Sequence, residues 1–205
     1  MKVLVACEYS GIVRDAFTAR GHDAWSCDLL PTERPGQHYQ GDILNMPGLE
    51  GFDLMIAHPP CDWVCVSGIH WNVRGRRGLS PRGCEIETRK AIRFAEILWE
   101  LPIKKKCLEN PIGVLSTRSK LGKPTQIIQP HQFGHDASKA TCIWLEELDP
   151  LEPTEIVEPR VVNGKNRWSN QTDSGQNRLG PSETRWKERS TTYNGIAQAM
   201  ATQWG

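Results

Sequence analysis

Short apolar runs alternate with helical patterns from Lys2 to Leu148. The runs that predict strands are 2–7, 23–27, 52–57, 103–108, 126–129 and 139–145. Apolar residues at three- and four-residue steps predict helices over 12–20, 85–101 and 195–204. This alternation is typical of an α/β protein with a mostly parallel sheet flanked by helices.

The strand predicted at 52–57 is followed by a proline pair, Pro59-Pro60. The prolines fix an extended backbone and present Cys61 just beyond the carboxyl end of the strand. Ligands of open α/β sheets bind at that edge, so a thiol held there on a stiff turn is a candidate nucleophile. The alternative is that Cys61 is a small buried apolar residue, the commonest role of a free cysteine.

A second polar group follows the strand predicted at 103–108, where Glu109 and Asn110 precede Pro111. The carboxyl ends of parallel strands meet at one edge of a sheet. We therefore expect Cys61 and Glu109 to lie at the same edge, on neighbouring strand ends.

The start of the chain has the pattern of a ligand-binding βαβ unit. The polar turn 8–11 separates the first strand from the first helix, and the second strand ends at Asp28. Backbone N–H groups of such a turn can hold a ligand, and Asp28 can accept hydrogen bonds from a ribose diol. Asp42 can accept the amino group of an adenine. Both acids are also ordinary turn residues of any α/β protein.

The segment 63–81 is predicted to be a long loop that carries Trp63 and Trp71. Its arginines and the one that follows are Arg74, Arg76, Arg77 and Arg82. Long loops in compact domains are usually functional or disordered, and arginines with aromatic residues suit phosphate contacts and base stacking. We expect a lid over the substrate, with a solvated surface loop as the alternative.

The composition changes after Leu148, and the segment 163–192 is rich in Gly, Asn, Ser, Arg and Lys. Such a segment cannot build a core by itself. We expect it to be partly ordered and to gain order on binding a polyanion. The alternative is a surface extension without a partner.

Size, charge and cysteine content narrow the class of protein. The chain has 205 residues, which predicts one domain. Its formal net charge of +1 predicts no overall electrostatic attraction to nucleic acid. The absence of a signal-peptide pattern and of a bilayer-length apolar stretch predicts a cytoplasmic protein without a membrane partner. Seven cysteines, an odd number without a framework pattern, predict reduced thiols. No metal is expected, because the chain lacks a paired Cys-x-x-Cys knuckle.

Taken in order, these residues resemble the DNA cytosine-C5 methyltransferase family, in the compact form of small phage-encoded members. The run Asp53-Leu-Met-Ile-Ala-His-Pro-Pro-Cys61 resembles the strand and Pro-Cys nucleophile motif, and Glu109-Asn110 resembles the Glu-Asn motif. The segment 8–17 resembles the cofactor turn and first helix. The segment 193–200 resembles the C-terminal motif that returns to the cofactor pocket.

The resemblance implies a Rossmann-like class I fold that uses S-adenosylmethionine, or a modified derivative of it, as cofactor. It implies that Cys61 adds to C6 of cytosine while Glu109, positioned with Asn110, activates N3. The residues implied to bind the cofactor are Glu8, Tyr9, Ser10, Gly11, Asp28, Leu29, Asp42, Ile43, His58, Pro59 and Asn194. Those implied to bind the DNA substrate are Pro60, Ser67, Arg74, Arg76, Arg77 and Arg82.

The resemblance also implies a domain organisation and a set of partners. The chain is divided into a catalytic core at 1–150, a reduced recognition-like segment at 151–190 and a C-terminal helix at 191–205 that returns to the core. The long recognition domain of larger members has no full counterpart, which leaves a homodimer or an accessory recognition partner open. The arginine that supports the base in those members has only Lys139 and Arg118 as candidates. A phage-encoded member would act in the cytoplasm of the host cell.

Other readings of the same residues stay open. His58-Pro-Pro-Cys61 also resembles the motif of methyltransferases that act on exocyclic amines of cytosine or adenine, where no thiol attacks. A family member could act on RNA or free nucleotide, or could transfer a modified methyl group. A non-catalytic module that binds cofactor or DNA is the alternative outside enzymes.

Overall fold

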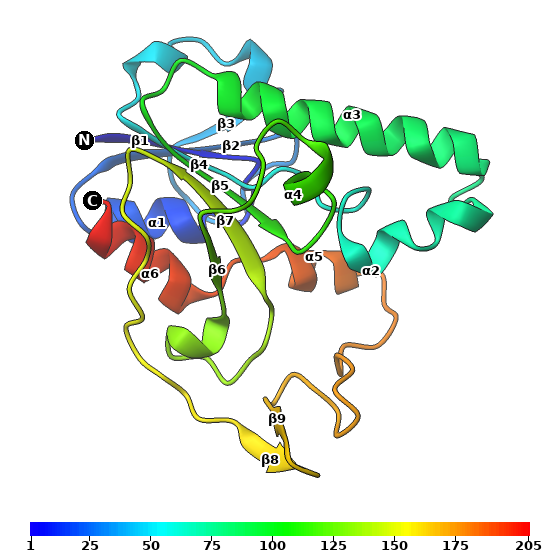
Figure 1. Cartoon of the computed structure of the whole chain (residues 1–205). Helices are drawn as coiled ribbons and strands as arrows, with labels where there is room; N and C mark the ends of the chain where they lie inside the picture. Colours follow the sequence, from blue (N-terminus) through cyan, green and yellow to red (C-terminus); the bar gives the residue numbers. More distant parts are fainter.

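The computed structural model describes residues 1–205. The strands of its main sheet are Lys2–Ala6 (β1), Asp23–Asp28 (β2), His38–Gln40 (β3), Leu54–Ala57 (β4), Lys105–Pro111 (β5), Gln126–Ile128 (β6) and Thr141–Glu146 (β7). These seven strands lie in the order β3-β2-β1-β4-β5-β7-β6 (Figure 1). Strands β1 to β5 pair in parallel, and β7 runs antiparallel to β5 and β6. The mixed, mostly parallel sheet confirms the predicted α/β class.

Helices cover both faces of this sheet. The helices are Ile12–Thr18 (α1), Val66–Ile69 (α2), Pro81–Glu100 (α3), Leu115–Arg118 (α4), Arg185–Ser190 (α5) and Asn194–Gln203 (α6). Short 3-10 turns lie at Ile43–Asn45, Leu49–Gly51, Asn72–Arg74 and Pro130–Gln132. In Figure 1, α1 and α6 lie below the sheet and α3 lies above it. The two ends of the chain therefore meet on one face, where α1 packs beside α6.

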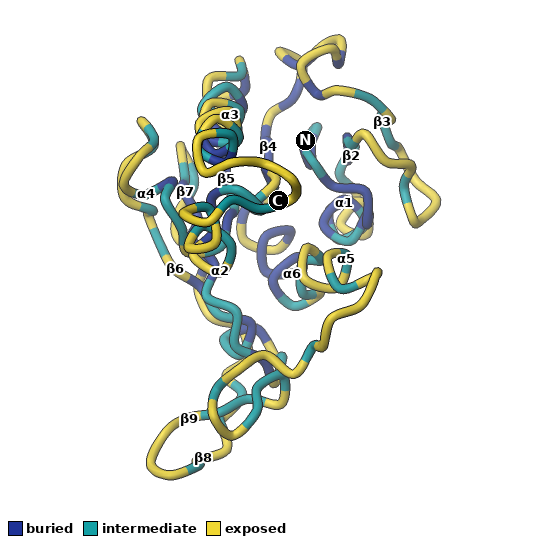
Figure 2. Tube along the Cα trace, turned by 90° about the vertical axis from the view of Figure 1, so that its right-hand side faces the viewer, coloured by how far each residue is buried: buried dark blue, intermediate teal, exposed yellow.

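The alternation of side chains along β1 divides the core between the two faces. Val3 and Val5 pack toward α1 and α6, whereas Leu4 and Ala6 pack with Leu98 of α3 on the opposite face. All of these side chains are buried (Figure 2). A strand that is apolar on both faces fits only in the middle of a covered sheet, where each such burial stabilises the fold by about 1.5–3 kcal/mol.

Several element boundaries differ from the predicted ones. Helix α3 begins at Pro81 rather than at residue 85, because the Ser80 hydroxyl accepts a hydrogen bond from the Gly83 N–H and Pro81 suits the first turn. Strand β5 continues through Pro111 because antiparallel β7 pairs with it from Lys106 to Pro111. The segments predicted as loops contain β3, α2 and a 3-10 turn.

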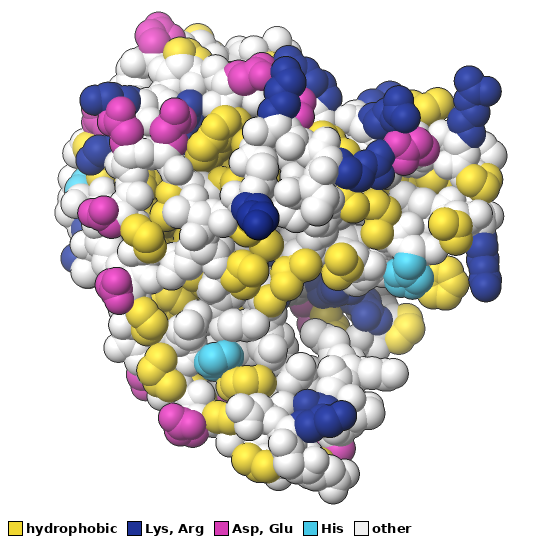
Figure 3. Space-filling model, in the orientation of Figure 1, with side chains coloured by type: hydrophobic (Ala, Val, Ile, Leu, Met, Phe, Trp, Pro, Cys, Tyr) yellow, Lys and Arg dark blue, Asp and Glu magenta, His cyan; other side chains and the backbone are white.

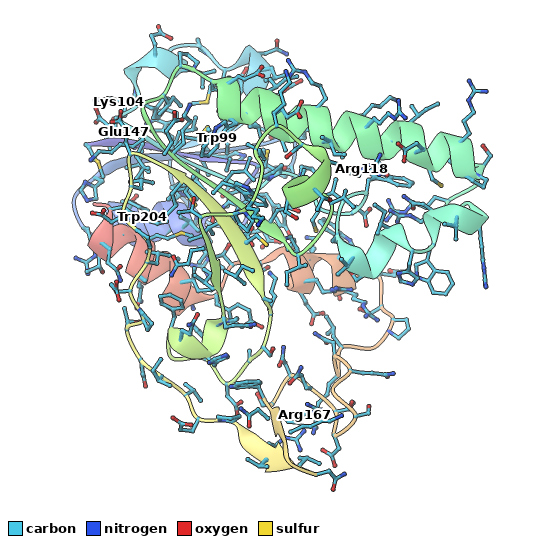
Figure 4. All side chains as sticks on the ribbon, viewed as in Figure 1. Trp99, Lys104, Arg118, Glu147, Arg167 and Trp204 are labelled. Carbon is cyan, nitrogen blue, oxygen red and sulfur yellow. The ribbon has the colours of Figure 1, made fainter.

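The far end of the sheet is closed by an ion pair between the start of β5 and the end of β7. Lys104 and Glu147, labelled in Figure 4, lie side by side with 3.1 Å between Nζ and Oε2. Both side chains are exposed, so such a pair contributes only about 0–1 kcal/mol. The chemistry-bearing residues lie at the opposite edge.

The polar segment after Leu151 forms a small hairpin of Arg160–Val162 (β8) and Lys165–Arg167 (β9), drawn below the main sheet in Figure 1. Several contacts hold this segment to the 130–139 loop, among them a ring stack and a pair of side-chain hydrogen bonds. Trp168 stacks on His131 with 4.3 Å between ring centroids, and Asn170 exchanges hydrogen bonds with the backbone of Ser138. The segment thus has defined contacts with the core in the structure. No helix of the chain is long and apolar enough to cross a membrane.

Arg14 of α1 is fully buried and joins this helix to the loop that follows β2. Its guanidinium donates to the hydroxyl groups of Ser26 and Thr32 and to the carbonyl groups of Arg34 and Pro35. It also pairs with Asp15 at 2.7 Å. Because a buried cation costs free energy unless its donors are satisfied, this set of acceptors fixes the conformation of the loop.

We expect Arg14→Met to lower the free energy of unfolding by about 2–4 kcal/mol, because it leaves Asp15 and buried hydroxyl groups without their donor. Urea denaturation followed by circular dichroism measures the change. Arg20→Met changes an exposed arginine just after the same helix and is the matched control. Equal stabilities of the two variants would contradict this assignment of Arg14.

Candidate functional site

The parallel pairing of β4 and β5 brings the first two site residues together. Ala57 is the pairing partner of Leu108, so the next residues along the two strands are His58 and Glu109. The His58 N–H donates to the Ala6 carbonyl at 2.9 Å, which holds the end of β4 against β1. The imidazole Nδ1 lies 3.1 Å from Glu109 Oε2. A histidine and a carboxylate therefore share a hydrogen bond at the carboxyl edge of the sheet.

Cys61 follows Pro59-Pro60 at the same edge and begins a helical turn. The N–H groups of Val64 and Cys65 both donate to the Cys61 carbonyl, and this turn brings the two thiols close enough to shift each other's pKa. Cys65 Sγ also lies 3.2 Å from the Ser67 hydroxyl. The site thus contains a pair of interacting thiols.

Strand β5 braces the cysteine turn from one side. The Asn110 side chain donates to the Pro59 carbonyl at 2.9 Å, and Asn110 is 1% exposed. Beyond β5, Gly113 passes so close to Val64 that a Cβ atom would lie 2.1 Å from the Val64 carbonyl oxygen. Glycine is required here by close approach of two backbones. The same strand therefore carries Glu109 and positions Cys61.

His58, Cys61 and Glu109 line one open cleft. The residues that line it are Cys7, Glu8, Tyr9, Ser10, His58, Pro59, Pro60, Cys61, Glu109, Pro111, Lys139 and 189–192. A second, smaller cavity shares Glu109, Lys139 and Thr192 with it and extends toward Tyr193 and α6. The cleft therefore runs from the turn after β1 to the turn after β4, and Glu109 and Lys139 line both it and the smaller cavity.

The charges around Glu109 favour its ionised form. Burial raises the pKa of Glu109, but the hydrogen bond from His58 and the positive charges of His58 and Lys139 outweigh burial and hold it below the ordinary value. Lys139 acts through its charge alone, since no hydrogen bond joins its side chain to Glu109. We infer that Glu109 is a carboxylate paired with His58 when no ligand is bound.

The two thiols of the site titrate as a pair. The hydrogen bond to Cys65, burial and the negative charges of Cys65 and Glu109 raise the pKa of Cys61. The hydrogen bond from Cys61, the Ser67 hydroxyl, the Gly68 N–H and the charge of Arg189 lower the pKa of Cys65 below the ordinary thiol range. The two thiols thus share one ionisation, and these causes favour the negative charge on Cys65.

The residues predicted to bind the cofactor lie along the carboxyl edge, but not all line the cleft. Glu8, Tyr9, Ser10, His58 and Pro59 line it, whereas Asp28 and Asp42 lie at the ends of the neighbouring β2 and β3. The remaining predicted residues, Gly11, Leu29, Ile43 and Asn194, do not line it. Leu29 is 72% exposed and Asn194 is exposed, whereas Ile43 is buried in the core. From the C-terminal segment, Thr192 and Tyr193 face the cavities in place of Asn194.

The carboxylate of Glu8 is hydrogen-bonded to the first turn of α1. It accepts hydrogen bonds from the N–H groups of Val13 and Arg14 and from the Ser10 hydroxyl. Glu8 therefore satisfies the amino end of α1, and Gly11 turns the chain with a φ of 72°. No cluster of three or more metal-ligating side chains is present in the structure.

The residues predicted to bind the substrate divide into two groups. Pro60 lines the cleft, and Ser67 lies beside Cys65. The guanidinium of Arg76 lies 3.9 Å from the ring centroid of Trp63 and donates to the Asp62 carbonyl, and Arg77 pairs with the Asp62 carboxylate at 2.6 Å. These two arginines hold the turn after β4. Arg74 and Arg82 are exposed, form no ion pair and do not line the cleft.

Of the two candidates for a base-supporting cation, Lys139 lines the cleft and Arg118 does not. Arg118, labelled in Figure 4, pairs with Glu85 of α3 outside the cleft, so the structure is against that candidate. Lys139 precedes β7, and its backbone N–H donates to the Gln129 side chain. The pairing of β7 with β5 is what places Lys139 next to Glu109.

Helix α5 closes the cleft from a distant part of the sequence, and sequence reasoning did not identify it. Trp186 lies against Tyr9 with 5.9 Å between ring centroids, and Lys187 pairs with Glu33 at 3.1 Å. On the other side, Arg189 donates to Ser67 at 3.4 Å. The helix thus bridges the turn after β1 and the turn after Cys61. Its basic and aromatic composition was the only signal in the sequence.

No protein-family model and no curated protein matches the chain. Among solved structures, one similar chain is a protein encoded within an E. coli prophage and described provisionally as a DNA modification methyltransferase. The TM-score is 0.47 and the sequence identity is 14%, over 77% of this chain and 52% of that chain. The present chain therefore spans about half the length of the solved structure that it matches.

We expect the protein to contain one thiolate at neutral pH and Cys65→Ser to abolish it, because the pKa of Cys65 is lowered. Removing its hydrogen-bond donor with Cys61→Ala should move the titration of Cys65 to higher pH. Titration of the ultraviolet thiolate absorbance measures both effects, and Cys84→Ser, a buried thiol in α3, is the control. A thiolate that survives Cys65→Ser and disappears in Cys61→Ala would place the charge on Cys61 instead.

Proposed function

We propose that this protein is a methyltransferase that uses S-adenosylmethionine to methylate C5 of cytosine in DNA through a covalent bond between Cys61 and C6. One observation carries the proposal: Cys61 and Glu109 line one cleft at the carboxyl edge of the sheet, with Lys139 beside them. A thiol to attack C6 and a carboxyl group to act on N3 are the two groups that this reaction requires.

The cofactor is proposed to bind along the ends of β1, β2 and β3. Asp28 accepts a hydrogen bond from the Leu30 N–H through Oδ1, and Asp42 accepts one from the Leu44 N–H through Oδ1. Each carboxylate keeps lone pairs that fit the hydroxyl groups of a ribose or the amino group of an adenine. When bound, S-adenosylmethionine, or a modified derivative of it, would supply an electrophilic carbon on a sulfonium sulfur.

The thiol pair is proposed to form and release the bond to the base. As Cys61 Sγ attacks C6, the Cys61 proton passes to the Cys65 thiolate, and the addition makes C5 nucleophilic. After C5 has been methylated, its proton leaves to a solvent base and the bond between Cys61 and C6 breaks. Cys65 then returns the proton to Cys61, so the pair ends in its initial state.

The depth of the site favours a base taken out of the helical stack. The Glu109 side chain is only 17% exposed, and a cytosine stacked in a duplex cannot reach it. Figure 3 shows a recess between the main body and the β8–β9 lobe, with Lys and Arg side chains at its margin. Arg189 at the mouth of the cleft, Arg167 of β9 and the exposed Arg74 are proposed to contact phosphates.

The geometry is less suited to methylation of an exocyclic amine. That chemistry needs a backbone carbonyl next to the proline pair to hold the amino group, and the Pro59 carbonyl already accepts a hydrogen bond from Asn110. Methylation of an exocyclic amine also does not require two interacting thiols. The experiment below distinguishes the proposal from three alternatives, which are RNA as substrate, free nucleotide as substrate and a role in binding alone.

We expect DNA from cells that express the wild type to contain 5-methylcytosine, and Cys61→Ser to abolish it. The hydroxyl group of serine is too weak a nucleophile to replace the thiol at C6. Nucleoside mass spectrometry of the DNA measures the product. Cys84→Ser, which changes a buried thiol in α3, should keep the modification and is the matched control.

Other products of the same measurement contradict specific parts of the proposal. A methylated exocyclic amine that survives Cys61→Ser would replace the C5 mechanism. A C5 adduct other than methyl would identify a modified cofactor. If DNA carries no modification while RNA or nucleotide does, the substrate assignment is wrong.

A further inference from the structure

The hydrogen bond between His58 and Glu109 has no task in the reaction described so far. It joins Nδ1 and Oε2 at 3.1 Å, between side chains that are 11% and 17% exposed. The second ring nitrogen, Nε2, is buried without a partner. The ring orientation is fixed because the His58 backbone is bound to β1 and its side chain to β5. Such a rigid pair next to a proposed catalytic carboxyl group points to a chemical role.

The proposed reaction creates a requirement that Glu109 alone does not meet. N3 of cytosine must gain a proton, or a strong hydrogen bond, as Cys61 adds to C6. The pKa of Glu109 is raised by burial but lowered further by His58 and Lys139, so the unliganded protein has a carboxylate at this position. The proton for N3 must therefore be stored on a neighbour that can pass it to Glu109.

We propose that His58 is a positioning residue that stores this proton and delivers it through Glu109 to N3 of the cytosine. The proposal rests on the C5 methylation proposed above and names a further residue of the same site. As Cys61 adds to C6, His58 Nδ1 gives its proton to Oε2 of the Glu109 carboxylate, and the resulting carboxyl group gives that proton to N3. When Cys61 leaves C6, N3 returns the proton to Glu109, and Glu109 returns it to His58. Glu109 is therefore a carboxylate before and after each transfer, and His58 is neutral only while N3 is protonated.

The other charged and titratable groups of the cleft are less suited to this task. Lys139, on the segment before β7, faces Glu109 without a hydrogen bond, so it has no direct path for a proton. Glu8, after β1, is bound to the amino end of α1. Cys61 and Cys65 exchange a proton with each other, and Arg189 of α5 cannot release one. His58 is the group that both carries an exchangeable ring proton and contacts Glu109 directly.

The first test separates proton storage from support of the structure by chemical rescue. We expect His58→Gly to lower kcat by about 100-fold while KM for DNA stays within about twofold, because proton transfer and not binding is lost. Added imidazole should restore kcat. Pyrazole has nearly the same shape but is too weak a base to be protonated near neutral pH, and it should not restore kcat. Equal rescue by both compounds would show that His58 only fills space, and would overturn the proposal.

The second test uses a variant that keeps the volume of the side chain. In His58→Gln, Glu109 must hold the proton alone beside the positive Lys139, so the alkaline fall in kcat should begin at lower pH than in the wild type. His22→Gln changes a histidine at the opposite end of β1 and β2 and is the matched control. An unshifted pH profile with a uniform loss of rate would overturn the proposal.

The third measurement does not depend on methylation. In protein labelled with ¹⁵N-histidine, the ring nitrogens of His58 should show a protonated imidazole that Glu109→Gln converts to the neutral form. A neutral His58 in the wild type would overturn the proposal even if 5-methylcytosine is formed. If the wild type shows the protonated pair but forms no 5-methylcytosine, the proposed function fails, and the proton delivery to cytosine fails with it.

Discussion

The site depends on the backbone hydrogen bonds between β4 and β5. Their register makes Ala57 the partner of Leu108, and this places His58 beside Glu109 at the carboxyl edge. Side chains alternate along β5, so Glu109 faces the cleft while Asn110 reaches the Pro59 carbonyl. A slip of one residue would exchange these two side chains and remove the carboxyl group from the cleft. The register is protected because β4 is apolar and buried on both faces, and because Cys107 and Leu108 of β5 are buried in separate clusters.

The antiparallel strand β7 makes this arrangement complete. Strand β4 ends at Ala57, and β5 continues as far as Pro111 only because β7 pairs with it from Lys106 to Pro111. The extension carries the chain past the end of β4 and back against the cysteine turn, where Gly113 allows backbone contact. It also brings Lys139, just before β7, within range of Glu109. Strand β7 thus determines two features of the site, which are the support of the cysteine turn by β5 and the positive charge of Lys139 near Glu109.

The cleft is closed by contacts between segments that are far apart in sequence. Arg14 holds the loop after β2, that loop presents Glu33 to Lys187, and helix α5 continues to Ser67 beside the thiol pair. The Lys187–Glu33 pair is half exposed on both sides and is weak by itself. A helix held by such contacts can move aside at low cost. Helix α5 therefore joins the proposed cofactor region to the proposed substrate region, and its position depends on its contacts with both.

The sequence by itself determined the elements and the chemistry at their ends. Apolar runs and helical periodicity predicted the α/β class, and the proline pair predicted that Cys61 follows a buried strand. These are local properties, because solvent exclusion and the fixed φ of proline act within a few residues. Only the tertiary structure decided which side chains meet. Strand register pairs His58 with Glu109. Helix packing brings Cys65 to Cys61, Arg76 to the ring of Trp63, and α5 over the cleft. A single sequence specifies neither the register nor the packing.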